Sequence, residues 1–323
     1  MNNPIVARGG VSAVISVASP DAKTLRVAPL AGRRPANCEY IFPVQQYDLE
    51  ATLTSGQTFG WERSGEGWTS VVQGRWVRLY QDGDSICART AEPQLAWDWL
   101  VEYLQVEVNL REVLATFPAD PHLRAAIASC RGLRLLRQEP WVCLASFILS
   151  STKQITQIRR IVAALCAAFG TPVIAPGAPP AFSFPTAARL AAASEAELRA
   201  CKMGFRAPYL LATARLIARG EFDLAGLRSL PLEEARAQLS RLPGVGGKIA
   251  DCVLLFAYGF PTAFPVDVWI ARTLREFYFR GRRVKPSQLH RFISGYFGPH
   301  AGYAQQYLFH YSRTARRSAT KAG

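Results

Sequence analysis

Short runs of alternating apolar and polar residues occupy the chain between residues 48 and 88 and predict strands. They span 48–53, 68–72, 76–80 and 85–88, and Gly-rich turns separate them. A period of two residues places alternate side chains on opposite faces of a strand, so the runs predict an antiparallel meander with one buried face. Residues 1–38 show no sustained period and are predicted to be a poorly ordered leader.

Beyond Ala91 the apolar residues recur at helical spacing. Ser194, followed three residues later by Glu197, forms a capping box that predicts a helix start. The segment 171–180, rich in Pro, Gly and Ala, is predicted to be a loop between helical lobes. We expect an α+β fold, with a small antiparallel β-sheet N-terminal domain at 39–133 and a larger all-helical domain at 134–323. The predicted helices span 141–149, 155–169, 208–218, 233–242, 248–258, 268–279 and 301–313.

The chain is strongly basic, with a formal net charge of +14. Its basic residues gather in two groups near the C-terminus, and such clusters are typical of proteins that bind a polyanion such as nucleic acid. With 49% hydrophobic residues the body is globular and not a disordered basic tail. The two groups are Arg280, Arg282, Arg283 and Lys285, and Arg313, Arg316, Arg317 and Lys321.

The 7 cysteines are scattered and form no CxxC pair, and the 4 histidines form no cluster. We therefore expect no zinc site, and no iron–sulfur cluster because no cysteine follows Cys252. Isolated cysteines fit a reducing compartment. The apolar segment 11–18 is too short to span a membrane. These features predict an intracellular protein without membrane association, in the cytoplasm or at the nucleoid, or in the nucleus of a eukaryote.

A glycine-rich turn, Leu242-Pro243-Gly244-Val245-Gly246-Gly247-Lys248, opens directly into a predicted helix. Free backbone N–H groups at a helix start bind anions, so Gly244, Val245 and Gly246 are candidate DNA-phosphate ligands. The helix dipole at this position favours the neutral form of Lys248, and a neutral amine is a nucleophile. A break at Gly259-Phe260-Pro261 lets the chain double back and bring Asp267 beside Lys248. A phosphate-binding turn, an amine nucleophile and a carboxylate within one hairpin are typical of a DNA glycosylase with lyase activity.

Two alternatives share the glycine turn. A nucleotide-binding P-loop needs Ser or Thr after the lysine, and this chain has Ile249 there. A hairpin that only binds the DNA backbone, as in a non-catalytic DNA-binding module, would use Lys248 as one more phosphate contact. Asp267 argues against that module, since a pure binding hairpin has no need of a returning carboxylate.

From about Asp48 to Phe309 the chain resembles the 8-oxoguanine DNA glycosylases of the helix-hairpin-helix (HhH-GPD) superfamily. The resemblance implies a bifunctional enzyme, a DNA N-glycosylase and AP lyase, that removes 8-oxoguanine from duplex DNA and needs no cofactor. The motifs that carry it are Ser55-Gly56-Gln57-Thr58-Phe59, Leu136-Arg137-Gln138-Glu139-Pro140, Phe147-Ile148-Leu149-Ser150-Ser151, Gly204-Phe205-Arg206, the hairpin through Asp251-Cys252, Pro265-Val266-Asp267 and Ala304-Gln305-Gln306-Tyr307-Leu308-Phe309.

By the resemblance Lys248 is the Schiff-base lysine and Asp267 the catalytic aspartate. Gly56 matches the glycine whose carbonyl accepts the N7–H of 8-oxoguanine, a hydrogen that guanine lacks. Cys252 and Phe309 match the pair that sandwiches the flipped base, and Gln305 matches the amide that reads its Watson–Crick edge.

The chain departs from the family pattern on the opposite strand. Thr152, Lys153 and Gln154 replace the asparagines that fill the gap left by the flipped base, and Gln157 stands where an arginine contacts the orphaned partner base. Arg206 matches a second such arginine, and Phe205 a stacking residue. Trp269 stands where a histidine often follows the catalytic aspartate.

The resemblance leaves a runner-up from the same superfamily, a monofunctional glycosylase for alkylated bases. Such enzymes keep the aspartate and generally lack a lysine at the hairpin position. Double-stranded DNA with an oxidised purine is the expected partner, and we expect a monomer.

Overall fold

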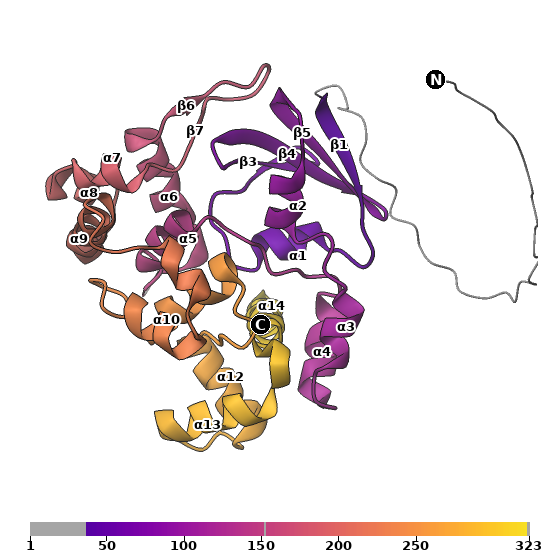
Figure 1. Cartoon of the computed structure of the whole chain (residues 1–323). Coiled ribbons are helices and arrows are strands. Elements are labelled where there is room, and N and C mark those ends of the chain that lie inside the picture. Colours follow the sequence, from indigo (N-terminus) through magenta and orange to yellow (C-terminus); the bar gives the residue numbers. More distant parts are fainter. Residues whose placement is uncertain (1–36, 152, 322–323) are drawn as a thin grey trace, which may run out of the picture. The chain divides into compact units, whose positions relative to one another are not determined.

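The computed structural model describes residues 37–151 and 153–321, and the side chains among them up to Thr314. The predicted α+β class is confirmed, since an antiparallel sheet precedes a helical region (Figure 1). Most of the expected leader lies outside the described residues, and the first strand begins at Asn37. The five-stranded sheet has the order β1-β5-β4-β3-β2, with β1 (Asn37–Pro43), β2 (Glu62–Ser64), β3 (Gly67–Val72), β4 (Arg75–Asp82) and β5 (Ser85–Gln94).

The sheet buries one face, as the alternating pattern predicts. Leu79 in β4 pairs with Trp68 in β3 and with Ala88 in β5, so these side chains share a face. They form a core with residues of two helices, α1 (Leu49–Thr54) and α2 (Asp98–Leu104), which cover this face of the sheet (Figure 1). The strands predicted at 68–72, 76–80 and 85–88 are therefore confirmed as β3, β4 and β5.

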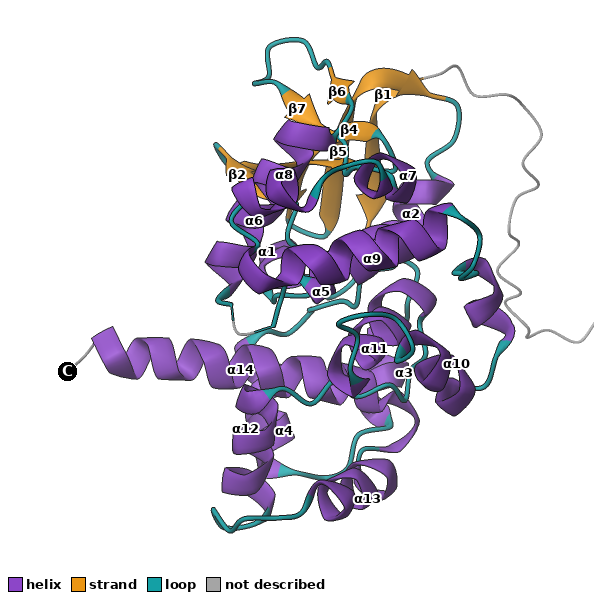
Figure 2. Ribbon diagram, turned by 90° about the vertical axis from the view of Figure 1, so that its left-hand side faces the viewer, coloured by secondary structure: helices purple, strands orange, loops and turns teal. Residues whose placement is uncertain are grey.

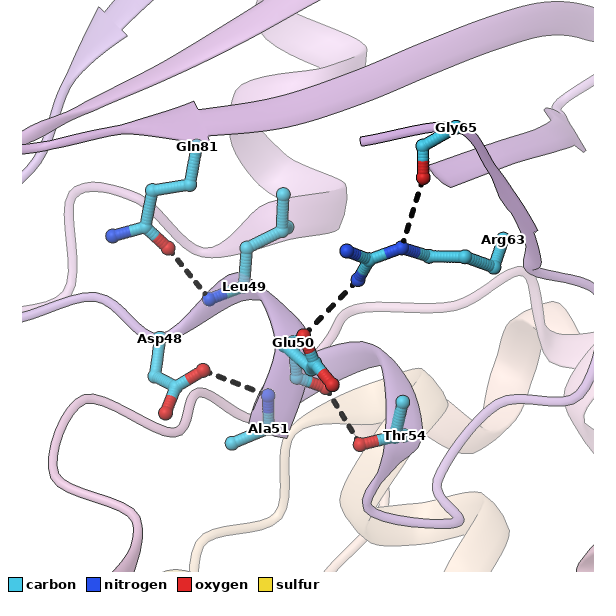
Figure 3. Close-up of polar contacts among 8 residues, drawn as sticks. All are labelled: Asp48, Leu49, Glu50, Ala51, Thr54, Arg63, Gly65 and Gln81. Carbon is cyan, nitrogen blue, oxygen red and sulfur yellow. Dashed lines mark hydrogen bonds and ion pairs between the residues drawn. The ribbon is translucent and has the colours of Figure 1, made fainter. Parts of the chain in front are cut away.

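The strand predicted at 48–53 is wrong, because these residues form helix α1 (Figure 3). Asp48 caps the helix, accepting a hydrogen bond from the Ala51 N–H at 2.8 Å. The six-residue run fits both the two-residue period of a strand and the period of a helix. Leu49 and Leu53 are four residues apart, which places them on one face of a helix, and both are buried. Gln81 of β4 accepts from the Leu49 N–H at 2.9 Å and ties the capped turn to the sheet.

Most of the remaining described chain is helical and packs around a second core. The predicted helices are confirmed with shifts of up to three residues at their ends, except that the helix predicted at 301–313 extends to Lys321. The segment predicted as a loop carries a short hairpin, β6 (Pro172–Val173) with β7 (Ala181–Phe182). The capping box is confirmed, with Ser194 and Glu197 bonded reciprocally. The helices are α3 (Leu110–Ala115), α4 (Pro121–Ser129), α5 (Pro140–Ile148), α6 (Ile155–Phe169), α7 (Ala187–Ala191), α8 (Glu195–Ala200), α9 (Ala207–Ala218), α10 (Leu232–Leu239), α11 (Gly247–Val253), α12 (Val268–Tyr278), α13 (Pro286–Tyr296) and α14 (Ala301–Lys321).

Shorter helical turns occur among the described residues, and one of them extends α11. The π-helical segment η3 (Leu254–Tyr258) continues α11, so that the two form one helical stretch ending at Gly259. The long helix α14 runs below α5 and α9 in Figure 2, and its Gln306 and Arg313 donate to the Ser55 and Thr54 carbonyls at the end of α1. The remaining turns are the 3-10 segments η1 (Gly204–Arg206), η2 (Ala225–Ser229) and η4 (Gly298–His300).

Candidate active site

The glycine turn forms the hairpin between α10 and α11. Gly244 has φ +76° and packs against Tyr209, whose Cβ would lie 2.8 Å from a methyl group added at Gly244. The Val245 N–H donates to the Leu242 carbonyl at 3.1 Å and closes the turn. The N–H groups of Gly246 and Gly247 donate to no described residue. Of the three predicted phosphate ligands, Val245 thus has its N–H engaged inside the hairpin, whereas Gly246 is the N-cap of α11.

Lys248 lies in the first turn of α11, with its side chain directed to the C-terminal end of α5. Its Nζ donates to Ser150 Oγ at 2.9 Å and lies 5.2 Å from the ring centre of Phe147. The Ser150 hydroxyl donates its own proton to the Phe147 carbonyl at 2.7 Å, which leaves an oxygen lone pair for the lysine. A backbone-anchored hydroxyl therefore fixes the position of the amine.

Asp267 is the N-cap of α12 and accepts from the Ile270 N–H at 2.7 Å. Burial raises the pKa of Asp267 above its ordinary value, while the Ile270 N–H and the positive charge of Lys248 act in the opposite direction. The same lysine charge acts on Cys252, whose pKa burial raises to about 12. The structure thus places Lys248, Asp267 and Cys252 within electrostatic reach of one another, and we call these three residues the catalytic cluster.

Gly56 lies far from the hairpin in sequence and meets α14. It has φ +87°, and a methyl group added there would lie 2.6 Å from Cδ1 of Ile155 and 3.3 Å from Cε1 of Phe309. The neighbouring Gln57 holds this position, because its Nε2 donates to the Arg134 carbonyl at 2.7 Å and its Oε1 accepts from the Leu136 N–H at 2.7 Å. The expected proximity of Gly56 and Phe309 is therefore present in the fold.

Gln305 precedes Phe309 by one helical turn, and both side chains therefore lie on the same face of α14. Gln305 is 4% exposed, and its buried Oε1 has no hydrogen-bond partner among the described residues. Gly56 is half-buried beside the ring of Phe309. A buried acceptor without a donor is costly in a folded protein and marks a position where a ligand can supply one. We call Gly56, Gln305 and Phe309 the recognition cluster.

One loop bridges the two clusters. Ser150, which holds Lys248, and Ile155, which packs against Gly56, are five residues apart, so the chain limits their separation to about 17 Å. A second link is the contact between the rings of Phe59 and Phe147, whose centres lie 5.5 Å apart. The amine and the glycine therefore belong to the same region of the molecule.

The residues predicted to contact the opposite DNA strand differ from one another in burial and in their contacts. Gln157 accepts from the Gln154 N–H at 3.0 Å and caps α6, so its carbonyl oxygen is engaged within its own helix. Arg206 is 2% exposed, and its guanidinium lies 4.2 Å from the ring centre of Phe205, which is 57% exposed. Thr152 lies outside the described residues.

No group of three or more His, Cys, Asp or Glu side chains is placed to hold a metal ion in the part of the chain that the structure describes. No helix among these residues combines the length and apolar character needed to cross a membrane. The basic residues Arg280, Arg282, Arg283 and Lys285 lie exposed between α12 and α13.

Sequence reasoning missed three residues of this region. Ser150 belongs to the motif Phe147-Ile148-Leu149-Ser150-Ser151, but no residue pattern in the sequence links it to Lys248. Ile155 begins α6 at a distance of 99 positions from Gly56 in the sequence, so their contact depends on tertiary structure. Arg313 appeared only in a basic group, although its position four residues after Phe309 places it on the same face of α14.

Comparisons with known proteins identify the family of the chain. The model for the 8-oxoguanine DNA glycosylase N-terminal domain matches residues 39–144, and that for the HhH-GPD superfamily base excision DNA repair proteins matches residues 145–299. The N-glycosylase/DNA lyase OGG1 of Arabidopsis thaliana is 32% identical over 291 residues, which span 83% of this chain and 79% of that protein.

Solved structures show the same relationship. The 8-oxoguanine glycosylase/lyase of Clostridium acetobutylicum, in complex with double-stranded DNA containing cytosine opposite 8-oxoG, is 29% identical with a TM-score of 0.79 and covers 84% of this chain and 93% of that one. The 3-methyladenine DNA-glycosylase of Archaeoglobus fulgidus, 22% identical with a TM-score of 0.71 and coverage of 85% of this chain and 98% of that one, shares the fold. The two family models together with the OGG1 relative establish that this chain belongs to the 8-oxoguanine DNA glycosylase family of the HhH-GPD superfamily.

Proposed function

We propose that this protein excises 8-oxoguanine from duplex DNA and then cleaves the strand as an AP lyase, in base excision repair. The unpartnered Oε1 of Gln305, on the helix face that also carries Phe309 beside Gly56, carries the proposal. 8-Oxoguanine presents an N7–H donor on one edge and N1–H and N2–H donors on the other. The Gly56 carbonyl fits the first edge, and Gln305 Oε1 fits the second. Guanine, which has an acceptor at N7, would meet the Gly56 carbonyl with two lone pairs facing each other.

The flipped base would stack on the Phe309 ring on one face and contact the Cys252 side chain on the other. Base flipping costs a few kcal/mol, and stacking on an aromatic ring returns part of that cost. The Cys252 thiol stays neutral because burial raises its pKa to about 12, so it offers a polarisable surface without a charge.

The catalytic cluster supplies the bond-breaking steps. As the bond between C1′ and N9 of the lesion breaks, its electron pair goes to the base, and the Asp267 carboxylate stabilises the positive charge that develops on the sugar. Lys248 Nζ then bonds to C1′, and the proton that the amine loses balances the one that the departing base takes up. The resulting imine permits removal of a C2′ proton and departure of the 3′ phosphate, after which water releases the lysine.

The hairpin would hold the DNA backbone beside this site. The N–H groups of Gly246 and Gly247 at the start of α11 suit a phosphate oxygen, and the net charge of +14 favours DNA as the partner. This activity places the protein wherever the cell keeps its DNA. None of the proposed steps calls on a cofactor, and we expect the protein to act as a monomer.

Trapping the imine tests the proposal. Borohydride reduces an imine to a stable amine, so the wild-type protein should form a covalent adduct with a duplex containing 8-oxoguanine. Lys248→Gln should abolish the adduct, whereas Lys202→Gln, a change at an exposed lysine after α8, should leave it intact. Undiminished trapping by Lys248→Gln would assign the nucleophile elsewhere, and failure of the wild type to release 8-oxoguanine would refute the proposed substrate.

A further inference from the structure

Ser150 lies two residues beyond the C-terminal end of α5, and two hydrogen bonds to one carbonyl hold it there. Its backbone N–H donates to the Phe147 carbonyl at 3.0 Å, and its hydroxyl donates to the same carbonyl at 2.7 Å. A carbonyl oxygen has two lone pairs, so these two donors fill it. The hydroxyl proton is therefore committed to the backbone, and Ser150 Oγ faces other groups as an acceptor.

The surroundings of Lys248 Nζ combine this acceptor with an aromatic ring. Nζ donates to Ser150 Oγ at 2.9 Å, and it lies over the Phe147 ring, 5.2 Å from the ring centre. The ring itself packs against two others, since its centre lies 5.5 Å from that of Phe59 and 5.6 Å from that of Phe256. An acceptor oxygen and an aromatic face both stabilise positive charge, so a nitrogen at this position can carry one.

We propose that Ser150 is a further catalytic residue, whose Oγ accepts a hydrogen bond from the iminium nitrogen of Lys248 during strand cleavage; this inference rests on the lyase half of the proposed function. The nitrogen carries three hydrogens as an ammonium, two as an amine and one as an iminium. Because the serine proton is held by the Phe147 carbonyl, Oγ can accept one of these hydrogens at every stage. A hydroxyl free to rotate could instead donate to the amine lone pair and weaken the nucleophile.

The Lys248 nitrogen is the group that takes up electrons during cleavage. The amine adds to C1′ of the abasic aldehyde, water leaves, and the positively charged C1′=N–H group forms. When the C2′ proton passes to solvent water, its electron pair forms C1′=C2′ and the nitrogen becomes neutral. The nitrogen pair then forms C1′=N again, the C1′=C2′ pair moves to C2′=C3′, and the 3′ phosphate leaves with the electrons of the C3′–O bond.

An acceptor at the iminium N–H acts on this sequence in two ways. It stabilises the positive charge on the nitrogen in the iminium from which the C2′ proton is lost. The iminium is also planar, so an N–H directed at Ser150 Oγ fixes the direction of C1′ and the plane that the breaking C2′–H bond must cross. A fixed orientation of the reacting bonds raises the rate of a reaction.

Single-turnover cleavage of a duplex with one preformed abasic site measures this step without base excision. A hydrogen bond to a charged group corresponds to about 10- to 100-fold in rate. Ser150→Ala should therefore cleave about 10- to 100-fold more slowly, whereas Ser150→Thr, which keeps the hydroxyl, should stay within about threefold of the wild type.

Ser129→Ala is the matched control for the loss of a serine at a helix end. The Ser129 hydroxyl, at the end of α4, also donates to the carbonyl three residues earlier, that of Ala126, at 2.8 Å. Ser129 is exposed, so this variant should cleave at the wild-type rate. Because Ser129→Ala and Ser150→Ala lose the same kind of local bond, thermal unfolding should show a similar small loss of stability in both.

The pH dependence of cleavage separates a catalytic serine from a structural one. Loss of an acceptor disfavours the charged form of a group, so the iminium of Ser150→Ala should lose its proton at a lower pH than that of the wild type. The alkaline limb of the cleavage profile should therefore move to lower pH in Ser150→Ala. It should stay in place in Ser150→Thr and in Ser129→Ala.

Three results would overturn the assignment of Ser150. Cleavage by Ser150→Ala within about threefold of the wild type would show that the iminium needs no such acceptor. A slow Ser150→Ala whose alkaline limb has not moved, or a Ser150→Thr as slow as Ser150→Ala, would make Ser150 a packing residue. The proposed function fails differently, through a wild-type protein that releases no 8-oxoguanine or cleaves no abasic DNA.

Discussion

Replacing Gly56 by alanine should separate recognition of the base from cleavage of the strand. The residue has φ +87°, and the added methyl group would lie 2.6 Å from Ile155 Cδ1 and 3.3 Å from Phe309 Cε1. Ile155 Cδ1 is the end of a flexible side chain and can move aside. The methyl group would nevertheless remain between the Gly56 backbone and the ring on which the base is proposed to stack.

Two magnitudes follow from this geometry. The left-handed backbone costs a non-glycine residue about 1–2 kcal/mol, which should lower the melting temperature by about 2–8 °C. A base displaced by about 1 Å from its reacting position can lose about 100-fold in rate. Gly56→Ala should therefore remain folded at 25 °C and excise 8-oxoguanine about 100-fold more slowly, because the folded state retains most of its stability but the base cannot seat.

Single-turnover excision from an 8-oxoguanine duplex measures the loss of rate, and strand cleavage at a preformed abasic site should stay near the wild-type rate. Gly220→Ala is the matched control, since Gly220 has φ +71° and a methyl group added there meets nothing within 4 Å. That control should lose similar stability and keep its excision rate. Excision by Gly56→Ala within about threefold of the wild type would show that Gly56 does not border the base.

Four further measurements probe the rest of the site. Asp267→Asn should keep DNA affinity and lose about 100- to 1000-fold in excision rate, because it removes a charge needed in the transition state; near-normal excision would make Asp267 structural. Since burial raises the pKa of Asp267 and the carboxylate is the active form, wild-type single-turnover rates should fall as the pH drops through a value above the ordinary range of an aspartate. Phe309→Ala should slow excision by about 10- to 100-fold while filter binding to undamaged duplex is unchanged, and an equal loss of both would make Phe309 a core residue. Excision opposite each of the four bases should differ by less than several hundredfold, because Gln157 caps α6 where the family places an arginine, and a larger preference for cytosine would show that another side chain compensates.

Much of the fold could be predicted because local pattern and tertiary packing agree. The strands β3, β4 and β5 alternate cleanly, and each buries the face that the pattern selects. The helix start at Ser194 follows from two side chains that bond each other without help from the rest of the fold. At 48–53 the alternating and helical periods fit equally well, and the Asp48 cap together with the Gln81 contact from β4 decides for the helix.

The site was predictable where a motif is contiguous and not where it depends on packing between distant segments. The hairpin and Pro265-Val266-Asp267 lie close together in the sequence, and the structure places Lys248 and Asp267 within electrostatic reach. The serine that holds Lys248 lies 98 residues away from it, so no local pattern reveals the contact. The burial of Arg206 likewise follows from its neighbours in space, since an arginine after a glycine turn would ordinarily be expected on the surface.

The two clusters have separate supports, and this separation explains why the predicted variants divide into two kinds. Gly56 is fixed to α14 through the Gln306 amide, which donates to the Ser55 carbonyl at 3.2 Å, and through Arg313, which holds the Thr54 carbonyl. Lys248 is held instead by Ser150 and the ring of Phe147. A change in the first set alters how the base seats but leaves the amine where it is. Base-contact variants should therefore fail on 8-oxoguanine and still cleave abasic DNA, whereas Lys248→Gln should fail on both, because only the amine is common to the two reactions.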